Sequence, residues 1–383
     1  MKILILGAGM MGRAIAFDLD KYSNFTNIEI VDKDTKAIQT TKKILKNKNI
    51  KYIKINLKNT QSVKELFKKH DIVISAAPYK YNYLLAKLAI KTKKHFLDLG
   101  GNNDIVKKEL SLFKKAEKNN VTIIPDCGLA PGLTSIITRE IVENMDNIKY
   151  VKIRVGGLPL NPKPPLNYQI VFSPNGLINE YTENSIVLDH GKIIQKKSMT
   201  ELETIIFPKP FNKMEAFLTS GGCSTLPYTY KNKIEYLDYK TIRYPGHCEK
   251  FKTLLALGLA DKNKIKIGKQ KIIPREVLSN LLLKNLPKNE EDVVLLKVTS
   301  EGIKNKITKK IKYTMIDYYD KTNKITAMMR TTAYPTSIIA QMIEKGLINK
   351  SGVYCPHEIV LCKPFFKDLK RRNIIIKKNI TSV

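Results

Sequence analysis

A glycine-rich turn within the first twelve residues constrains the fold more than any other feature of this chain. Residues 2–6 form an apolar, strand-like run, and Gly7, Gly9 and Gly12 follow in G-x-G-x-x-G spacing before a helical apolar pattern. Gly7 permits the tight turn, Gly9 lets a pyrophosphate approach the backbone, and Gly12 lets the helix pack on the strand. The pyrophosphate of a dinucleotide is therefore expected on the amino end of that helix. The residues predicted to hold it are Gly7, Gly9, Met10, Met11 and Gly12.

Asp32 gives this glycine motif its context. A second apolar strand, residues 27–31, ends directly before Asp32, at the distance from Gly12 where a carboxylate accepts hydrogen bonds from the adenosine ribose. A carboxylate at this position repels a 2′-phosphate, so the pattern favours NAD over NADP. The neighbouring Lys33 is compatible with a phosphate and leaves NADP open.

The following residues alternate between strand and helix patterns and predict a doubly wound, parallel α/β (Rossmann) domain. Asn56 and Leu57 end the third strand and are expected to flank the adenine, whereas Ala76, Ala77 and Pro78 follow the fourth strand and leave room for the nicotinamide ribose. The six expected parallel strands are residues 2–6, 27–31, 50–57, 71–75, 95–99 and 121–125, and the fourth of them breaks into a loop of small residues that ends at Pro78.

Beyond Lys149 the pattern changes to that of a second, α+β domain. A helix is then expected from Thr336 to Lys345, with Pro335 at its start and Gly346 just past its end. Residues from Pro356 onward are expected to form a surface tail. The expected strands of the second domain are residues 150–156, 168–173, 191–198, 203–207, 293–301 and 306–319, and its expected helices are residues 248–258 and 274–285.

Two polar segments are candidates for chemistry. Asp98 ends a strand and precedes Gly100, so its carboxylate is placed either to orient an amine and take its proton or to cap the next helix. The turn that begins at Asp126 offers backbone N–H groups to a carboxylate. Residues 241–247, TIRYPGH, are expected to form a loop that carries Thr241, Arg243 and His247.

Composition narrows the function classes. The net charge is +32, but the excess is almost all lysine and is spread along the chain, which argues against specific nucleic-acid binding. No apolar run approaches the length of a membrane span and the N-terminus has no signal-peptide pattern, so we expect a cytoplasmic protein without membrane contact. The five cysteines contain no C-x-x-C pair, and neither a disulfide framework nor a metal site is predicted.

With these residues in view, the chain resembles the saccharopine dehydrogenase superfamily, and within it the lysine 6-dehydrogenase branch. The resemblance rests on several stretches in family order: GAGMMG, LDLGGN, PDCGLAPG, GGLP, FSPNGLINEYTE, TIRYPGH and AYPTSIIAQMI. It implies two hinged domains with the substrate between them, and a chain that returns to the first domain after the second. The implied boundaries are 1–130 with 331–383 for the NAD-binding domain and 131–330 for the substrate and oligomerisation domain. A homo-oligomer is also implied.

The resemblance further implies an NAD-dependent oxidative deamination of the ε-amino group of L-lysine, whose product, 2-aminoadipate 6-semialdehyde, cyclises spontaneously. Arg243 is the natural partner for the substrate carboxylate, because its guanidinium fork is bidentate. The amine must be neutral before hydride leaves its carbon, so a base is required; Asp98 is the first candidate, His247 the second, and Lys80 and Tyr81 are outside candidates. The predicted substrate-binding residues are Arg243, Thr241, Gly100 and Asp126.

Two alternatives remain open from the sequence. Saccharopine dehydrogenase proper acts on a secondary amine with additional carboxylates, for which Lys163, Lys209 or Arg154 are candidate cations. A non-catalytic NAD-binding protein of the same fold is an alternative of a different class.

Overall fold

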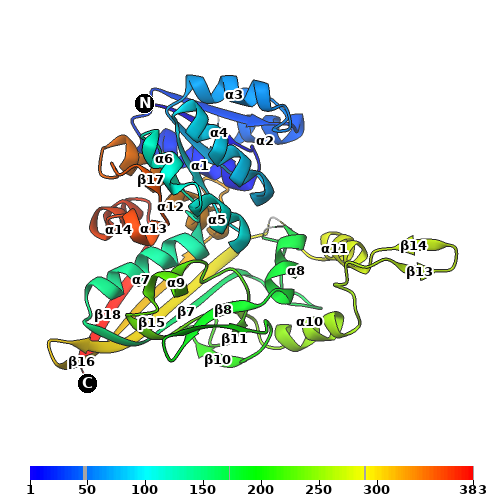
Figure 1. Ribbon diagram of the computed structural model, residues 1–383. Coiled ribbons are helices and arrows are strands. Elements are labelled where there is room, and N and C mark those ends of the chain that lie inside the picture. The colour runs from blue at the N-terminus through cyan, green and yellow to red at the C-terminus, as the bar shows by residue number, and fades with distance from the viewer. Residues whose placement is uncertain (46–49, 172, 289, 383) are drawn as a thin grey trace. The chain divides into compact units, whose positions relative to one another are not determined.

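The computed structural model describes residues 1–45, 50–171, 173–288 and 290–382 and divides the chain into two compact units (Figure 1). Unit 1 comprises Met1–Glu140 and Met329–Ile374, and unit 2 comprises Ile141–Met328 and Ile375–Val383. The chain thus returns to unit 1 within a single helix. Its last nine residues belong to unit 2, not to the first domain as expected.

Unit 1 is built on a seven-stranded parallel sheet with the order β17-β6-β5-β4-β1-β2-β3. The six predicted strands are confirmed, and β17 is an addition at the edge. The order reverses between β1 and β4, where doubly wound sheets bind ligands at the carboxyl ends of their strands. The strands are β1 (Lys2–Leu6), β2 (Asn27–Asp32), β3 (Ile50–Lys54), β4 (Ile72–Ser75), β5 (His95–Asp98), β6 (Thr122–Ile124) and β17 (Gly352–Val353). The helices are α1 (Met10–Tyr22), α2 (Thr35–Leu45), α3 (Thr60–Lys69), α4 (Asn82–Thr92), α5 (Asn103–Leu110), α6 (Phe113–Lys118), α7 (Thr134–Glu143), α12 (Ala327–Glu344), α13 (Pro356–Ile359) and α14 (Cys362–Arg371).

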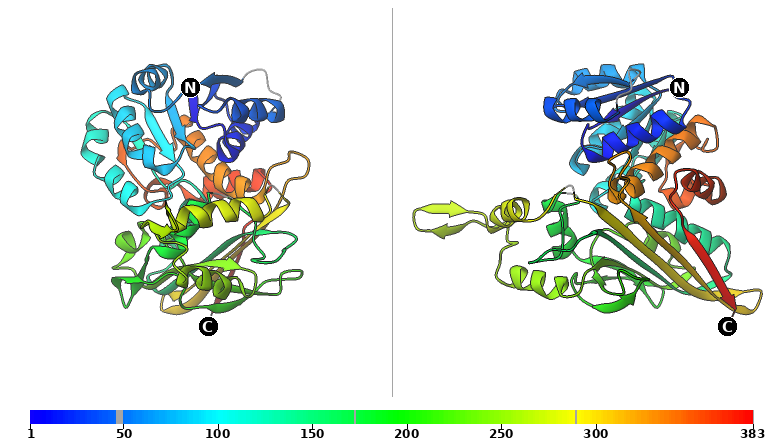
Figure 2. Two further views of the ribbon diagram at one scale, coloured as in Figure 1. Left: turned by 90° about the vertical axis from the view of Figure 1, so that its right-hand side faces the viewer. Right: turned by 180° about the vertical axis from the view of Figure 1, so that it is seen from behind.

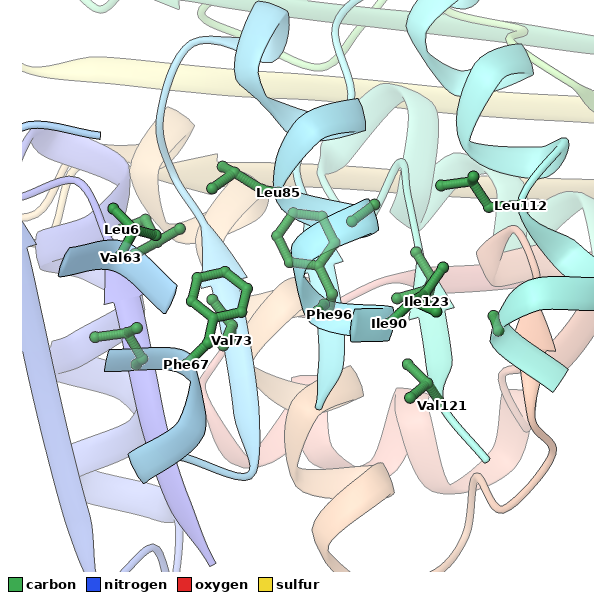
Figure 3. Close-up of a cluster of buried hydrophobic side chains, with 14 of the residues drawn as sticks. Leu6, Val63, Phe67, Val73, Leu85, Ile90, Phe96, Leu112, Val121 and Ile123 are labelled. Carbon is green, nitrogen blue, oxygen red and sulfur yellow. The ribbon is translucent and has the colours of Figure 1, made fainter. Parts of the chain in front are cut away.

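Apolar helix faces cover both sides of this sheet. Phe67 of α3 and Ile90 of α4 pack against Leu6, Val73 and Phe96 of the strands (Figure 3). On the opposite face, α1 approaches so closely that a Cβ on Gly12 would lie 3.4 Å from a methyl group of Ile5. Alternate strand residues therefore point into two separate cores, which is why the strands are almost continuously apolar.

Residues 356–374 are part of unit 1 and do not form a surface tail. Arg372, which follows α14, donates from Nε to Asp18 of α1 at 2.6 Å, and Ser337 of α12 donates to the same carboxylate at 2.5 Å. These contacts fix the returning segment against the first helix. Pro335 lies inside α12, not at its start, whereas Gly346 ends the helix with a φ of +70° as predicted.

Unit 2 contains a nine-stranded mixed sheet in which β12 and β7 are parallel and the other pairs are antiparallel. Its longest path is β10-β11-β12-β7-β15-β16-β18, and β8 and β9 branch from β12. The strands are β7 (Asn147–Pro159), β8 (Ser185–Asp189), β9 (Lys192–Lys196), β10 (Glu203–Ile206), β11 (Lys213–Leu218), β12 (Ile234–Arg243), β15 (Asp292–Lys304), β16 (Ile307–Tyr318) and β18 (Lys377–Ser382). The helices are α8 (Pro174–Thr182), α9 (Leu226–Tyr230), α10 (His247–Ala256) and α11 (Pro274–Asn285).

Two segments of unit 2 differ from expectation. Residues 168–171 and Ser173 do not form a strand, and Phe172 lies outside the described residues; only Ile170 makes an isolated bridge, to Lys288. Tyr168 and Val171 are nevertheless buried among helices, so the apolar pattern reported burial and not extended structure. Thr241 and Arg243 end β12 instead of lying in a loop, and His247 begins α10.

A hairpin of β13 (Ile265–Ile267) and β14 (Gln270–Ile272) extends from the region of α11 (Figure 2). Its two strands pair with each other and form a separate two-stranded sheet. None of the helices described is long and apolar enough to cross a bilayer.

Candidate functional site

The turn between β1 and α1 is held in shape by backbone and side-chain hydrogen bonds. The Gly7 N–H donates to the Val31 carbonyl at 2.7 Å, and the Ala8 N–H donates to Oδ2 of Asp32 at 2.8 Å. Thr41 of α2 donates to the Ala8 carbonyl at 2.8 Å. Asp32 is therefore at the end of β2 beside the glycine turn, as the sequence predicted.

The glycines of this turn fit a dinucleotide. A Cβ on Gly12 would lie 1.8 Å from the Gly7 carbonyl oxygen, so only glycine permits this approach of α1 to the turn. Gly9 is exposed, precedes the first residue of α1, and has open space where its Cβ would stand. The N–H groups at the start of α1, including those of Met10 and Met11, thus face a position that a pyrophosphate can approach.

The remaining predicted cofactor residues lie at the same carboxyl edge of the sheet. The Ala76 N–H donates to the Leu6 carbonyl at 2.9 Å, which places Ala76, Ala77 and Pro78 beside the glycine turn. Asn56 is exposed after β3, and Leu57 packs against the apolar core. Lys80 is exposed, with its ammonium 5.4 Å from the Tyr81 ring centroid.

Asp98 ends β5 and is completely buried, with 0% of its surface exposed. Its Oδ1 accepts the Gly100 N–H at 2.6 Å, and the backbone amide of Asp126 also faces the carboxylate. Gly100 has a φ of +72°, and a Cβ there would lie 2.0 Å from Oδ1 of Asp126, so position 100 must be glycine. The predicted base Asp98 and the predicted substrate-binding residues Gly100 and Asp126 are thus neighbours in this structure.

Glu109 of α5 joins this cluster, and sequence reasoning did not find it. Its carboxyl group lies within hydrogen-bonding reach of Asp98 and is also completely buried. Burial, followed by the repulsion of Asp98, raises the pKa of Glu109 far above its usual range, and burial also raises the pKa of Asp98. The only sequence signal for Glu109 is one glutamate in a lysine-rich helix, which is typical of a solvated surface.

A second polar cluster lies in unit 2 around Arg243, which is 3% exposed. Because side chains alternate along a strand, Thr241 and Arg243 share one face of β12 while Ile242 enters the opposite core. The Arg243 guanidinium donates from Nε to the Tyr181 hydroxyl at 2.8 Å and from Nη1 to the Ile242 carbonyl at 2.9 Å. Its carbon Cζ lies 4.8 Å from the centroid of the Tyr168 ring.

His247 supports Arg243 through Tyr181. Its Nδ1 lies 2.9 Å from the Leu166 carbonyl, which can only accept, so Nδ1 carries the proton and Nε2 accepts the Tyr181 hydroxyl at 3.0 Å. Burial, and secondly the charge of Arg243, lowers the pKa of His247 to about 3. Both ring nitrogens are thus committed, and the geometry contradicts the prediction of His247 as a base.

No carboxylate among the described residues forms an ion pair with Arg243. Glu215 lies directly opposite it on β11, but its two oxygens accept the N–H groups of Gly246 and Cys248 at 2.9 and 2.6 Å at the start of α10. Glu180 influences Arg243 from a greater distance, and burial raises its pKa to about 7. Arg243 is therefore a buried cation that lacks a close counter-ion in the described part of the chain.

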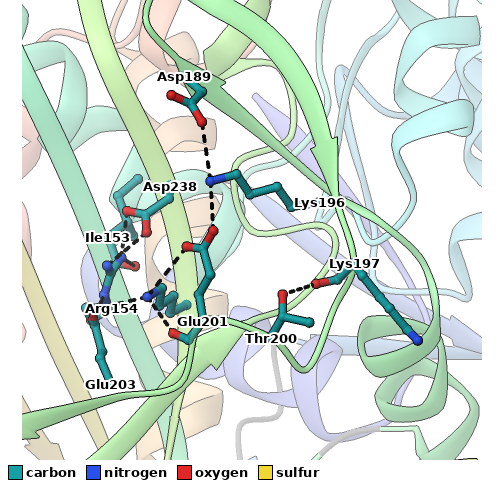
Figure 4. Close-up of polar contacts among 10 residues, drawn as sticks. Ile153, Arg154, Asp189, Lys196, Lys197, Thr200, Glu201, Glu203 and Asp238 are labelled. Carbon is teal, nitrogen blue, oxygen red and sulfur yellow. Dashed lines mark hydrogen bonds and ion pairs between the residues drawn. The ribbon is translucent and has the colours of Figure 1, made fainter.

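The other predicted residues of unit 2 are placed less favourably for a ligand. Thr241 exchanges a hydrogen bond with Thr219 at 2.8 Å. Arg154 is held by Asp238 and Glu203 (Figure 4), Lys163 pairs with Glu290 at 2.8 Å, and Lys209 is exposed. All five cysteines are buried, and none of them forms a disulfide in the described part of the chain.

The fold and these residues define a protein with a nicotinamide-dinucleotide-binding Rossmann domain and a second domain built on a mixed sheet. Residues 3–124 match the saccharopine dehydrogenase NADP binding domain, and residues 128–375 match the saccharopine dehydrogenase C-terminal domain. The chain therefore belongs to the saccharopine dehydrogenase family.

Two kinds of curated relative illustrate the similarity. The chain is 24% identical over 283 residues to mitochondrial alpha-aminoadipic semialdehyde synthase of Mus musculus, and the match covers 68% of this chain but 28% of the mouse protein. It is 21% identical to saccharopine dehydrogenase [NADP(+), L-glutamate-forming] of Schizosaccharomyces pombe, over 87% of this chain and 89% of that protein.

Solved structures support the fold. The apo saccharopine dehydrogenase (L-Glu forming) of Saccharomyces cerevisiae aligns with a TM-score of 0.80 at 19% identity and covers 99% of both chains. A homospermidine synthase from Legionella pneumophila, solved with NAD, aligns with a TM-score of 0.70 at 14% identity, over 99% of this chain and 91% of the other.

Proposed function

We propose that this protein is a nicotinamide-dependent dehydrogenase that oxidises the C–N bond of an amino-acid amine, with the ε-amine of L-lysine as substrate and NAD as cofactor. Family membership supports the reaction class. The observation that carries the substrate class is Arg243, because a buried guanidinium without a close carboxylate is stabilised by an anionic ligand.

In this proposal Arg243 binds the α-carboxylate of the substrate. Tyr181 and His247 hold the guanidinium in a fixed orientation through their hydrogen bonds, and Tyr168 packs on its face. The planar fork of arginine then selects a carboxylate by geometry as well as by charge. His247 is thus proposed to position Arg243, and the base is sought elsewhere.

Asp98 is proposed to accept the proton of the substrate ammonium. Only the neutral amine can release hydride from its adjacent carbon, and the bound nicotinamide supplies the hydride acceptor. The resulting iminium is hydrolysed by water to an aldehyde and ammonia. Once Asp98 has released the first proton to solvent, its carboxylate can take a proton from the attacking water and return it to the nitrogen that leaves as ammonia. The N–H groups of Gly100 and Asp126 keep Asp98 oriented during these steps.

Saccharopine is the second candidate substrate, favoured by the names and the coverage of the relatives. Its further carboxylates need further cations. Arg154 is paired with two carboxylates, and Lys163 is an exposed residue paired with Glu290. These pairings support lysine, with its single carboxylate, over the larger substrate.

The preference for NAD is proposed from Asp32. Its carboxylate is already fixed by the amides of Ala8 and Asp34, at 2.8 and 2.9 Å, so it cannot turn away from an incoming 2′-phosphate without losing both bonds. Two observations favour NADP instead: the matching family model is named for NADP, and the exposed Lys33 follows Asp32. The direct test compares the activities of Asp32→Ala and of the parent protein with each cofactor. We expect the variant to gain activity with NADP relative to NAD.

The deciding experiment follows NADH absorbance with the purified protein, NAD or NADP, and L-lysine, saccharopine or L-ornithine. Growth of the signal with lysine and NAD supports the proposal. Turnover with saccharopine alone replaces lysine by the second candidate. Cofactor binding, measured by quenching of tyrosine fluorescence or by calorimetry, without turnover of any amine favours a non-catalytic NAD-binding protein.

A further inference from the structure

Glu109 is a buried acid whose carboxylate receives no hydrogen bond from any N–H group that the structure describes. It is completely buried, and both of its oxygens lack a donor. Asp98, in contrast, accepts the Gly100 amide, and its second oxygen, Oδ2, has no N–H donor. If both carboxyl groups were ionised, three buried oxygen atoms would have no hydrogen-bond donor: both oxygens of Glu109 and Oδ2 of Asp98. Burying negative charge in this way is strongly unfavourable.

One proton shared between the two carboxyl groups removes most of this unfavourable free energy. If Glu109 is protonated, its O–H donates to Asp98, and one hydrogen bond satisfies an oxygen on each residue. Neither residue has an ion pair with a lysine, arginine or histidine in the part of the chain that the structure describes, so no cation takes the place of that proton. The backbone donors converge on Asp98, which selects Asp98 as the ionised partner.

We propose that Glu109 is a positioning residue that retains a proton at neutral pH and donates it in a hydrogen bond to Asp98, which keeps the buried Asp98 ionised and ready to accept a proton. This inference deepens the proposed function, because Asp98 is the base there.

The surroundings of the pair agree with this assignment. Asp126 lies near the pair, and its negative charge disfavours ionisation of Glu109. The neighbouring Cys127 thiol is neutral, because burial raises its pKa. Cys355 adjoins Cys127. Asn82 of α4 is a neutral neighbour of Asp98, and its Oδ1 accepts the Ser75 hydroxyl at 2.9 Å. Burial and the charge of Asp98 raise the pKa of Glu109, in the direction that the proton requires.

The first test is infrared spectroscopy of the purified protein at neutral pH, without substrate. We expect a carbonyl band of a protonated carboxylic acid that disappears in Glu109→Gln and persists in Glu117→Gln, an exposed control on the neighbouring helix. Absence of a band that depends on Glu109 overturns the proposal. This readout needs no turnover, so it stands even if the substrate assignment fails.

The second test compares the pH dependence of kcat/KM in Glu109→Gln and Glu109→Leu. The glutamine amide still donates to Asp98, so the acid limb should stay close to that of the parent. Leucine removes the donor, and the acid limb should move upward by about one pH unit, a roughly tenfold loss on the acidic side. Superimposable limbs in the parent and in Glu109→Leu overturn the proposal. If the leucine variant does not fold, the infrared result decides.

Discussion

Arg154 and Arg243 lie on adjacent parallel strands of the same sheet and are equally buried, at 3% exposure each, yet their surroundings are opposite. Arg154 bonds to both oxygens of Asp238, at 2.8 and 2.9 Å, and to Glu203. Figure 4 shows this network. Lys240 connects Glu203 to Glu201, and Lys196 connects Glu201 to Asp189. Arg243 has a tyrosine hydroxyl, a backbone carbonyl and aromatic rings.

The difference separates a structural cation from one that is prepared for a ligand. A buried charge with matched carboxylates is satisfied within the fold, and its removal leaves those carboxylates uncompensated. A buried charge without a counter-ion costs folding free energy, and binding of an anion recovers it. Residue type and burial are the same in both cases, so only the partners reveal the role.

The largest expected effect is that of Arg243→Met on catalysis. Loss of a buried partner for a substrate carboxylate costs about 2–5 kcal/mol, or roughly 30- to several-thousand-fold in kcat/KM. Thermal stability should be unchanged or higher, because an uncompensated cation is removed. Steady-state kinetics and calorimetry on the same preparation measure both. A variant that loses stability and keeps activity would remove the distinction between the two arginines.

Arg154→Met should show the opposite pattern. Asp238 would lose its cation, and Glu203 would keep only Lys240, at 3.1 Å. Because both carboxylates are partly exposed to solvent, we expect a loss of about 2 kcal/mol in the free energy of unfolding. Denaturant titration measures this loss. We expect kcat/KM to stay within about twofold of the parent. A catalytic defect as large as that of Arg243→Met would return Arg154 to the list of substrate-binding candidates.

Tyr181→Phe tests the support of Arg243. The change removes the hydroxyl that links Nε of Arg243 to His247 and should cost about 1–2 kcal/mol, expressed mainly as a higher KM for the carboxylate-bearing substrate. Tyr168→Phe is the matched control, because the ring that packs on the guanidinium is retained. Equal effects of the two substitutions would contradict the proposed role of the hydroxyl.

The smallest effect concerns pH. The pKa of His247 is lowered to about 3, so the unfolded chain binds a proton there at pH values where the folded chain does not. Stability should therefore fall as the pH drops below about 6.5, with a contribution of up to about 1.4 kcal/mol per pH unit. His247→Asn should reduce this slope, with Tm measured between mildly acidic and neutral pH. His357, whose pKa is also lowered to about 3, contributes in the same direction and remains in both proteins.

Much of unit 1 was predictable because its determinants are local. The glycine turn, the apolar strands and Asp32 follow one another in sequence, and a parallel sheet with alternating helices permits few topologies.

The structure of unit 2 was harder to predict from the sequence. The buried segment around Tyr168 was mistaken for a strand, because an apolar run reports burial and does not specify backbone conformation. The helix at Pro174–Thr182 was missed, although it supplies Tyr181.

The sequence by itself determined the dinucleotide-binding turn, the position of Asp98 at a strand end and the resemblance to the saccharopine dehydrogenase family, because each depends on residues close together in the chain. The tertiary structure alone decided which buried charges are satisfied. Arg154 contacts Asp238, Asp98 contacts Glu109, and Arg243 contacts Tyr181 but forms no ion pair with a carboxylate of the described residues. These partners come from different elements, and the cost or benefit of burying a charge depends on the groups that folding places beside it.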